Sequence, residues 1–366
     1  MTTQPRTTKP GPEQAELRAT MRTLAEAAAD DALILSIYVD VRPQAHGKRP
    51  GERPELTAVR DRLRDIEATL RAHAPERTSF DADVDRIERY LEDEDLSGTD
   101  GLALFACDRI GLWEDIRSHE PFETQVAAGP NADLFQVARL LDDSVSAVVA
   151  IVHINACRLF VTRRRALAEL DGPEEPPDEH RRHDQGGWSQ ARYQRHVDMQ
   201  DRRFAKEVAG ALAQVVERER AQHVILAGDE RAIPILEGEL STRVRGLVEQ
   251  VVHIAPRLNR DEVLAEVAPI LAALEAAEAQ DVADRAIAGW RAGDLGVVGV
   301  DATARALERG QVDQLVISDD AGIPEDRRAE LVRQAALTDA GVEVVRDHSG
   351  LAKQGGVGAT LRFRIS

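Results

Sequence analysis

The chain has 366 residues, a length typical of two or three domains. Its formal net charge is −18, from 65 acidic and 47 Lys or Arg residues. This excludes a general nucleic-acid coat, which needs a basic footprint, but leaves room for RNA contact by one local patch. The cysteines Cys107 and Cys157 stand outside any CxxC or Cys/His cluster, so we expect two buried thiols and neither a disulfide nor a zinc site.

The hydropathy pattern gives no sign of a membrane protein. No apolar run approaches the roughly 20 residues that span a bilayer. Residues 1–13 are polar, contain proline and lack the apolar core of a secretory signal. We therefore interpret residues 1–13 as a disordered tail and expect a cytoplasmic protein without a membrane partner.

Residues 1–143 are predicted to form an α/β domain. The run ALILSIYVDV at 32–41 is rich in aliphatic and β-branched residues, which favour a strand, and a Pro/Gly-bearing basic loop follows it. In chain order we expect a helix over 13–29, this strand, helices over 55–72 and 81–91, a strand over 101–107 and its return at 109–113.

Residues 144–258 are predicted to form a second α/β domain, because strands alternate with helices and this indicates a parallel or mixed sheet. Residues 171–187 are dense in Pro, Glu, His, Arg and Gly. A long loop inside a compact domain is usually functional or disordered. The expected elements are strands 146–154 and 156–162, the loop, a helix over 190–219, and strands 223–227 and 247–254.

Residues 259–366 are predicted to form a third α/β unit with a leading helix. Asn259 is a suitable helix cap, and Asp261 and Glu262 fall in the first turn, where acidic side chains favour the helix dipole. We expect next a loop or short strand at 296–300, helix 301–308, strand 312–318, helix 325–338, and strands 342–345 and 360–365.

The segment RRHDQGGWSQARYQR, from Arg181 to Arg195, carries the first functional signal. It resembles the peptidyl-transfer loop of archaeal and eukaryotic class-1 release factors. That loop is basic and glycine-rich, and carries Gly-Gly-Gln, then Ser, two small or apolar residues, Arg, an aromatic residue and Arg. The matching positions are Gly186, Gly187, Ser189, Arg192, Tyr193 and Arg195.

A second resemblance lies near the end of the chain. Residues 299–317 resemble the segment of release factors and Pelota in which Gly, acidic residues near Thr, and Ala-Leu precede a Gly turn and an apolar strand. Residues 355–363 resemble the last Gly-rich turn and strand of the same domain. Together the matches cover roughly 144–366, whereas residues 1–143 show only a compatible α/β unit without an Asn-Ile-Lys-Ser codon-reading motif.

The resemblance implies a bacterial branch of the release-factor and Pelota superfamily, in which some relatives are ribosome rescue or hibernation factors. It implies a divergent N-terminal domain, a ribonuclease-H-like middle domain that holds the glycine loop, and an α/β/α C-terminal domain resembling kink-turn RNA-binding ribosomal proteins. It implies no cofactor. The histidines also fit no standard zinc spacing; they are His153, His180, His183 and His196.

The glycine loop departs from the family at its central position, where Trp188 replaces the glutamine. In the family this glutamine orders the attacking water, chiefly through its main-chain amide. Trp188 keeps that N–H, and Gln185 and Gln190 are the two candidates for the missing amide side chain. Two other roles for Trp188 are open: stacking on an unpaired base, or packing on its own domain beside a simple glycine hinge. The candidate catalytic positions are Gly186, Gly187, Trp188 and Gln190.

The charge of this region favours RNA. Between His180 and Lys206 there are seven Lys or Arg and three acidic residues, a local charge of +4. Such side chains typically contact phosphates. The candidate RNA-binding residues are Arg181, Arg182, His183, Gln185, Ser189, Arg192, Tyr193 and Arg195.

Three functions follow from these patterns. The first is a ribosome-associated translation factor that enters the A site in rescue, quality control or hibernation, with ribosomal RNA and P-site tRNA as partners. The second is a peptidyl-tRNA hydrolase that uses Gly186 and Gly187, and the third is an interaction scaffold away from the ribosome. A partner translational GTPase stays open, and DNA is not expected. No P-loop, GxGxxG or nucleophile elbow occurs, which argues against nucleotide hydrolysis and serine hydrolase chemistry.

Overall fold

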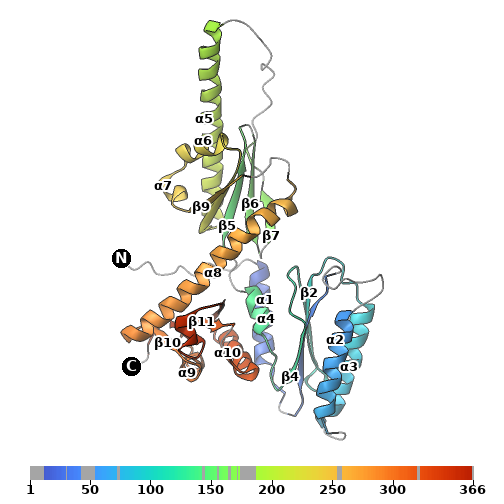
Figure 1. Cartoon of the computed structure of the whole chain (residues 1–366). Coiled ribbons are helices and arrows are strands. Elements are labelled where there is room, and N and C mark those ends of the chain that lie inside the picture. The colour runs from blue at the N-terminus through green and yellow to red at the C-terminus, as the bar shows by residue number, and fades with distance from the viewer. Residues whose placement is uncertain are drawn as a thin grey trace. The chain divides into compact units, whose positions relative to one another are not determined.

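In the computed structural model the chain divides into two compact units (Figure 1). One unit contains residues 143–277, and the other joins residues 9–142 with residues 278–366. No described helix is long and apolar enough to cross a membrane. The structure describes residues 12–29, 31–42, 54–71, 75–141, 145–154, 156–163, 166–170, 172–173, 187–253, 258–319 and 322–364.

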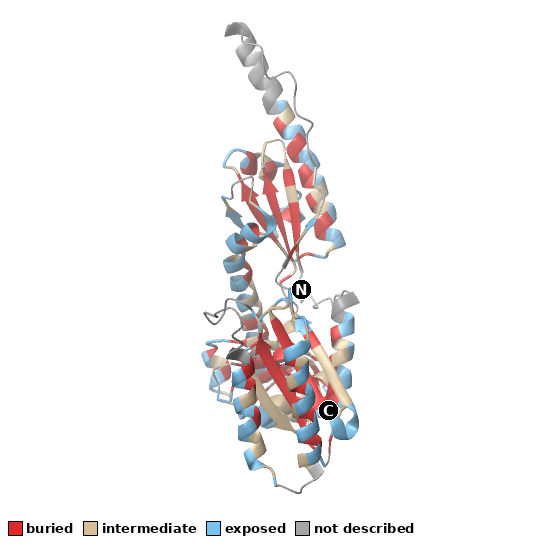
Figure 2. Cartoon of the chain, turned by 90° about the vertical axis from the view of Figure 1, so that its right-hand side faces the viewer, coloured by how far each residue is buried: buried red, intermediate tan, exposed pale blue. Residues whose placement is uncertain are grey.

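The stretch 9–142 forms an antiparallel sheet with strand order β3-β2-β1-β4 and helices on both faces. The central strands β1 and β2 are buried along their whole length because apolar side chains alternate onto both faces (Figure 2). The elements are α1 (Pro12–Glu26), β1 (Ile34–Asp40), α2 (Pro54–Thr69), α3 (Pro75–Asp93), β2 (Gly101–Cys107), β3 (Leu112–Ser118), β4 (Gln125–Gly129) and α4 (Phe135–Leu141).

The stretch 278–366 forms a mixed sheet with strand order β10-β13-β11-β12, in which only the β11–β12 pair is parallel. Before this sheet comes the second half of α8 (Arg260–Ala292), whose first half belongs to the other unit. The remaining elements are β10 (Gly296–Val298), α9 (Val300–Glu308), β11 (Val312–Ser318), α10 (Glu325–Leu337), β12 (Gly341–Val345), α11 (Ser349–Ala352) and β13 (Val357–Leu361).

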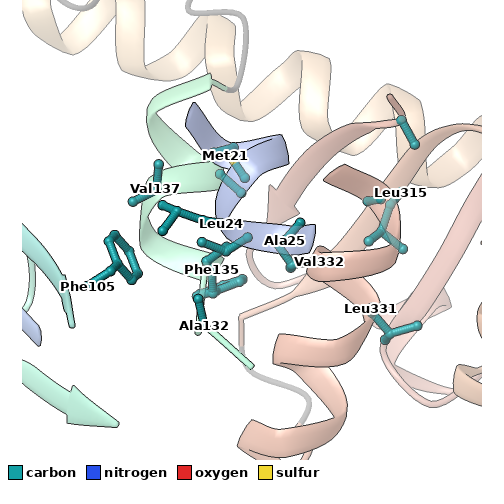
Figure 3. Packing of buried hydrophobic residues seen from close by; sticks show 14 of the residues in the cluster. Met21, Leu24, Ala25, Phe105, Ala132, Phe135, Val137, Leu315, Leu331 and Val332 are labelled. Atoms are coloured by element: carbon teal, nitrogen blue, oxygen red, sulfur yellow. The ribbon is translucent and has the colours of Figure 1, made fainter. Parts of the chain in front are cut away.

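These two stretches share one hydrophobic core (Figure 3). Leu24 of α1 and Phe135 of α4 belong to the same buried cluster as Val332 of α10. The Arg333 guanidinium of α10 also donates to the main-chain oxygen of Ala25, at 3.2 Å. The first and last parts of the chain therefore form one folded body. The division into three domains stays a prediction.

The unit of residues 143–277 is built on a sheet with strand order β7-β6-β5-β8-β9. Strands β5, β8 and β9 run parallel, whereas β6 and β7 are antiparallel to their neighbours. Buried clusters lie on both faces of the sheet. The elements are β5 (Ala147–Val152), β6 (Cys157–Arg163), β7 (Ala166–Leu170), α5 (Gly187–Arg218), β8 (His223–Gly228), α6 (Ala232–Glu239), α7 (Thr242–Arg245), β9 (Val248–Val252) and the first half of α8.

The predicted mixed α/β class is confirmed, and both cysteines are free and buried as expected. Burial raises the pKa of the Cys157 thiol to about 12, which makes it unreactive. Several elements were not predicted, among them β4, α4 and β7. Residues 166–170 read ALAEL, a composition that favours a helix, yet they pair with β6 as strand β7. The last strand begins at Val357, inside the expected Gly-rich turn, and ends at Leu361.

Candidate nucleic-acid interface

Helix α5 begins at the second glycine of the Gly-Gly pair. Gly187 is its first residue, and Trp188, Ser189 and Gln190 complete the first turn. The next turns carry the remaining helical candidates, Arg192, Tyr193 and Arg195. Arg181, Arg182, His183, Gln185 and Gly186 lie outside the described residues. The predicted helix start at residue 190 is therefore three residues late.

The later part of α5 anchors the helix to the sheet. Phe204, Val208 and Leu212 are buried at four-residue spacing, and Val215 and Val216 continue the same side. These side chains belong to the cluster that covers one face of the sheet. An apolar stripe with this spacing holds one side of a helix against the core. The position of α5 is thus determined by its residues from 201 onward.

The start of α5 contributes main-chain N–H groups to the Gly-Gly segment. The first N–H groups of any helix have no partner within the helix, and the helix dipole adds partial positive charge there. Such a terminus is well suited to an anion such as a phosphate. The N–H of Trp188 falls in this first turn.

A polar cluster lies at the carboxyl ends of the parallel strands β5 and β8. His153 follows β5, and its Nδ1 is 3.4 Å from Oδ2 of Asp229, which follows β8. Gly228 makes this approach possible because it has a φ of +139°, and a Cβ there would lie 1.9 Å from the oxygen of Val152. The close approach of the two strand ends therefore depends on the absence of a side chain.

The same cluster fixes α5. The side chain of Asp201 on α5 is buried and accepts a hydrogen bond from the Arg231 guanidinium at 3.1 Å. The other Asp229 oxygen, Oδ1, accepts the N–H groups of Arg231 at 3.0 Å and Ala232 at 2.7 Å. Helix α5, strand β8 and helix α6 are thus joined through one Asp–Arg pair and one Asx turn.

This cluster is a support for the interface and not part of it. Residues 187 and 201 are 14 positions apart, or about 21 Å along a helix. No sequence pattern pointed to Asp201 or Arg231. Asp229 and His153 do follow parallel strands, and open sheets place functional groups at such strand ends. Among the described residues no group of three His, Cys, Asp or Glu could hold a metal ion.

A family comparison matches the middle of the chain. Residues 135–288 match the family model described as bacterial archaeo-eukaryotic release factor family 10. The matched segment runs from α4 into α8 and contains the Gly-Gly segment with all of α5. No curated protein sequence matches the chain.

Solved structures show a weaker likeness. An archaeal translation termination factor, aRF1, is 20% identical over 96% of this chain and 98% of its own, with a TM-score of 0.28. Pelota from Archaeoglobus fulgidus is 16% identical over 73% and 80%, with a TM-score of 0.39. An archaeal Pelota in a ribosome-bound model with ABCE1 is 13% identical over 98% and 99%, with a TM-score of 0.42. These low TM-scores carry no argument, so the assignment depends on the family match.

Proposed function

Because this chain belongs to the bacterial branch of the archaeal–eukaryotic release-factor superfamily, we propose that it is a translation factor that binds the ribosome and enters the A site. The observation that carries the proposal is the content of the family match, which contains the basic Gly-Gly segment and the helix that starts at its second glycine. Rescue of stalled ribosomes, quality control and hibernation are the roles that fit.

The partners follow from the same segment. The basic side chains of the segment would contact phosphates of ribosomal RNA and of P-site tRNA, and the N-terminus of α5 would add main-chain donors. We further propose that the 143–277 unit is the ribonuclease-H-like domain, since its sheet is mixed with helices on both faces. The mixed sheet of residues 278–366 would be the domain related to kink-turn RNA-binding ribosomal proteins. A partner translational GTPase is part of the proposal.

Occupying the A site is favoured over releasing the peptide, because Trp188 replaces the glutamine and residues 1–143 lack a codon-reading motif. An indole donates one hydrogen bond but accepts none, so the side chain of Trp188 lacks the acceptor that the glutamine side chain offers to a water. Peptidyl-tRNA hydrolysis is the second candidate. Its support is the Trp188 N–H, which belongs to the first turn of α5, where helix N–H groups have no partner within the helix, and which could stabilise an oxyanion.

Ribosome co-sedimentation tests the leading proposal, with and without tRNA in the A site. Replacing Arg181, Arg182, Arg192 and Arg195 with Glu should abolish association and leave the far-ultraviolet circular dichroism unchanged. A-site tRNA should compete with the wild type. Association should fall with added salt, because phosphate contacts release counterions.

The matched control reverses Arg202 and Arg203, which are exposed on the same helix but farther from the Gly-Gly pair. Arg203 already forms an i, i+4 pair with Glu207. This variant should bind within about twofold of the wild type, because exposed pairs of this kind contribute little. Binding that ignores the four-residue reversal, the salt and the A-site tRNA would rule the proposal out.

A further inference from the structure

A groove of about 1110 Å³ runs along the outer edge of strand β4, in the unit that joins the two ends of the chain. All five residues of β4 line it. Its walls are the second half of α2, from Arg62 to Leu70, and the start of α10, from Glu325 to Glu330. Neither the family match nor the proposed ribosome binding uses this groove.

The strand at the bottom of the groove has an open edge. β4 is the last strand of the sheet order β3-β2-β1-β4, and none of the described segments pairs with it on the outer side. The edge of a sheet presents main-chain N–H and C=O groups that can pair with another extended chain. Lined by helices on two sides, this edge accepts a single strand and not a second sheet.

The strand register identifies the outward groups. Val41, which follows β1, donates its main-chain N–H to the main-chain oxygen of Asp100, on the β2 side. Because main-chain groups alternate along a strand, those of Asp40 point to the β4 side. The Asp40 N–H indeed donates to Thr124 Oγ1 on that side, at 3.3 Å.

The same alternation turns the main chains of Ile34, Ser36 and Tyr38 toward β4. These residues are opposite Gly129, Ala127 and Gln125. Val126 and Ala128 therefore direct their N–H and C=O groups into the groove.

Acidic residues outnumber basic ones in the lining of the groove, where Arg62 is the one basic side chain among the described residues. Asp65 on α2, and Glu325 and Asp326 on α10, are exposed and form no ion pair with other described residues. Acidic residues in the first turn of α10 also favour its dipole. The helix dipole does not explain Asp65, which lies in the second half of α2, away from its N-terminus. It also does not explain why the edge of β4 is open. Complementary charge selects cationic partners.

The two walls differ in their apolar content. Ile66 of α2 and Leu70 just after it lie beside the groove with Val126, and they pack against the hydrophobic cluster on that side of the sheet, although Arg62 and Asp65 also line this wall. Glu325, Asp326 and Glu330 lie on the α10 side. Side chains of an extended chain alternate between two faces, so a ligand would direct apolar residues toward α2 and basic residues toward α10.

We propose that this groove binds an extended segment of a partner protein in which basic and apolar residues alternate, and that the segment adds to the sheet as a strand beside β4. Strand addition of this kind obtains its affinity from main-chain hydrogen bonds and its specificity from alternate side chains. The proposal does not depend on ribosome binding.

Fluorescence anisotropy on the full-length chain tests it, with a labelled nonapeptide that alternates Lys and Val. The wild type should bind this peptide at least tenfold more tightly than a matched Glu–Val peptide. Two further peptides carry N-methyl groups on either the Lys or the Val residues. Only one of these two sets of N–H groups can face β4, so one methylated peptide should lose at least tenfold in affinity and the other should not.

Ala128→Pro removes an outward N–H at an edge position where proline is tolerated, and Ala128→Ser is its matched control. Proline should weaken binding at least tenfold, whereas serine should not. Glu325→Lys with Asp326→Lys should weaken binding similarly, in contrast to Glu308→Lys on α9, which lies outside the groove. The charge variants and the methylated peptides keep the test decisive if Ala128→Pro fails to fold.

Several results would overturn the proposal. One is an equal effect of both methylations on affinity, whether a loss or none, because simple charge attraction does not distinguish the two edges of a peptide. Another is undiminished binding by a folded Ala128→Pro protein. A third is concentration-dependent dimerisation of the wild type that Ala128→Pro abolishes, since a second copy of the chain would then occupy the edge.

Discussion

The guanidinium carbon of Arg328 lies 4.0 Å from the centre of the Phe135 ring. Arg328 is on α10, whereas Phe135 is the first residue of α4, so the contact joins the last part of the chain to the first. Arg328 also lowers the pKa of the buried Asp133 carboxyl, although burial, the larger effect, raises it. The contact between the Arg328 guanidinium and the Phe135 ring therefore lies where residues 9–142 and 278–366 share a core.

A double-mutant cycle on this contact should show coupling. Phe135→Leu keeps an apolar side chain but removes the ring, and Arg328→Met keeps length but removes the charge. We expect the two losses of unfolding free energy to be non-additive by about 0.5–2 kcal/mol, measured by urea denaturation. The control is Arg158→Met in the other unit, paired with Phe135→Leu, which should be additive. Additivity in the Arg328 cycle would mean that the ring–cation contact contributes nothing.

Asp83 gives a prediction for pH. Its side chain is 2% exposed and its Oδ2 accepts the Asp108 N–H at 3.1 Å. Burial raises its pKa from 3.8 to about 6, although the hydrogen bond from the Asp108 N–H, the next largest effect, lowers it. The charge of Asp108 adds to the rise, and Ser79 and Arg86 oppose it. A raised folded-state pKa means that the stability contributed by the protonated form is complete below pH 3.8 and is lost as the pH rises through 6.

Asp83→Asn keeps an acceptor for the Asp108 N–H and removes the titration. The variant should be more stable than the wild type above pH 6, by on the order of 1–2 kcal/mol, with a difference that shrinks as the pH falls toward 4. Denaturation curves at several pH values check this. A constant difference over the whole range would show that the effect does not come from ionisation.

Two glycines form a matched pair for stability. Gly228→Ala should destabilise the 143–277 unit by several kcal/mol, since its Cβ would lie 1.9 Å from a main-chain oxygen at a φ of +139°. Gly210 on α5 has nothing within 4 Å of the same position. Gly210→Ala should therefore stabilise the unit by about 0.5–1 kcal/mol. Thermal unfolding of both variants is the measurement, and equal effects would contradict the close approach of β5 and β8.

The cap of α8 gives a smaller effect. Asn259 Oδ1 accepts the N–H groups of Asp261 and Glu262, both at 3.0 Å, and Glu262 accepts the Asn259 N–H at 2.7 Å. Asn259→Ala should cost about 1 kcal/mol, while Asn259→Asp should retain most of the cap. If both variants unfold at the same denaturant concentration as the wild type, the reciprocal cap does not stabilise the helix.

The Gly-Gly segment separates a binding factor from an enzyme. On programmed ribosomes with peptidyl-tRNA in the P site, we expect little or no peptide release by the wild type. Trp188→Ala should weaken ribosome binding by about 1–3 kcal/mol if the indole stacks on a base. If release does occur, Gly187→Ala should impair it far more than binding, since a side chain would block close approach of the main chain to RNA.

Gln190→Ala completes this set. Release that is slowed by this change, with binding intact, would mean that Gln190 has taken over the role of the family glutamine. A robust burst of released peptide, lost in Gly187→Ala, would make this protein a release enzyme. If neither the wild type nor any variant binds the ribosome, both the translation-factor and the hydrolase functions are excluded, and the interaction scaffold is the function that stays.

Local patterns predicted the regular elements well where one signal dominated. The aliphatic run before Asp40 became β1, and the cap at Asn259 formed as its chemistry suggests. Strand β4 escaped prediction because QVAAG has neither alternation nor β-branched density, and only its pairing with β1 makes it a strand. No sequence pattern revealed that α1 and α4 share a core with α10, because that contact depends on tertiary packing alone.

The candidate interface was predictable only as a motif. The Gly-Gly pair and its arginines identified the segment, and the apolar stripe from Phe204 onward predicted the helix behind it. The Asp201–Arg231 pair that fixes this helix was not predictable, because charged residues on an exposed-looking helix do not reveal which of them is buried. The groove beside β4 was missed for the same reason as the strand itself.

The shared core has a consequence for biosynthesis. Residues 9–142 and 278–366 complete each other, but the ribosome delivers them separately, with the whole of 143–277 in between. At about 5–20 residues per second, roughly ten to forty seconds pass between the synthesis of residue 142 and that of residue 337, where α10 ends. During that interval the nascent α1 and α4 display Leu24 and Phe135 without their cover. The vectorial order of synthesis thus leaves this core incomplete until α10 has been made.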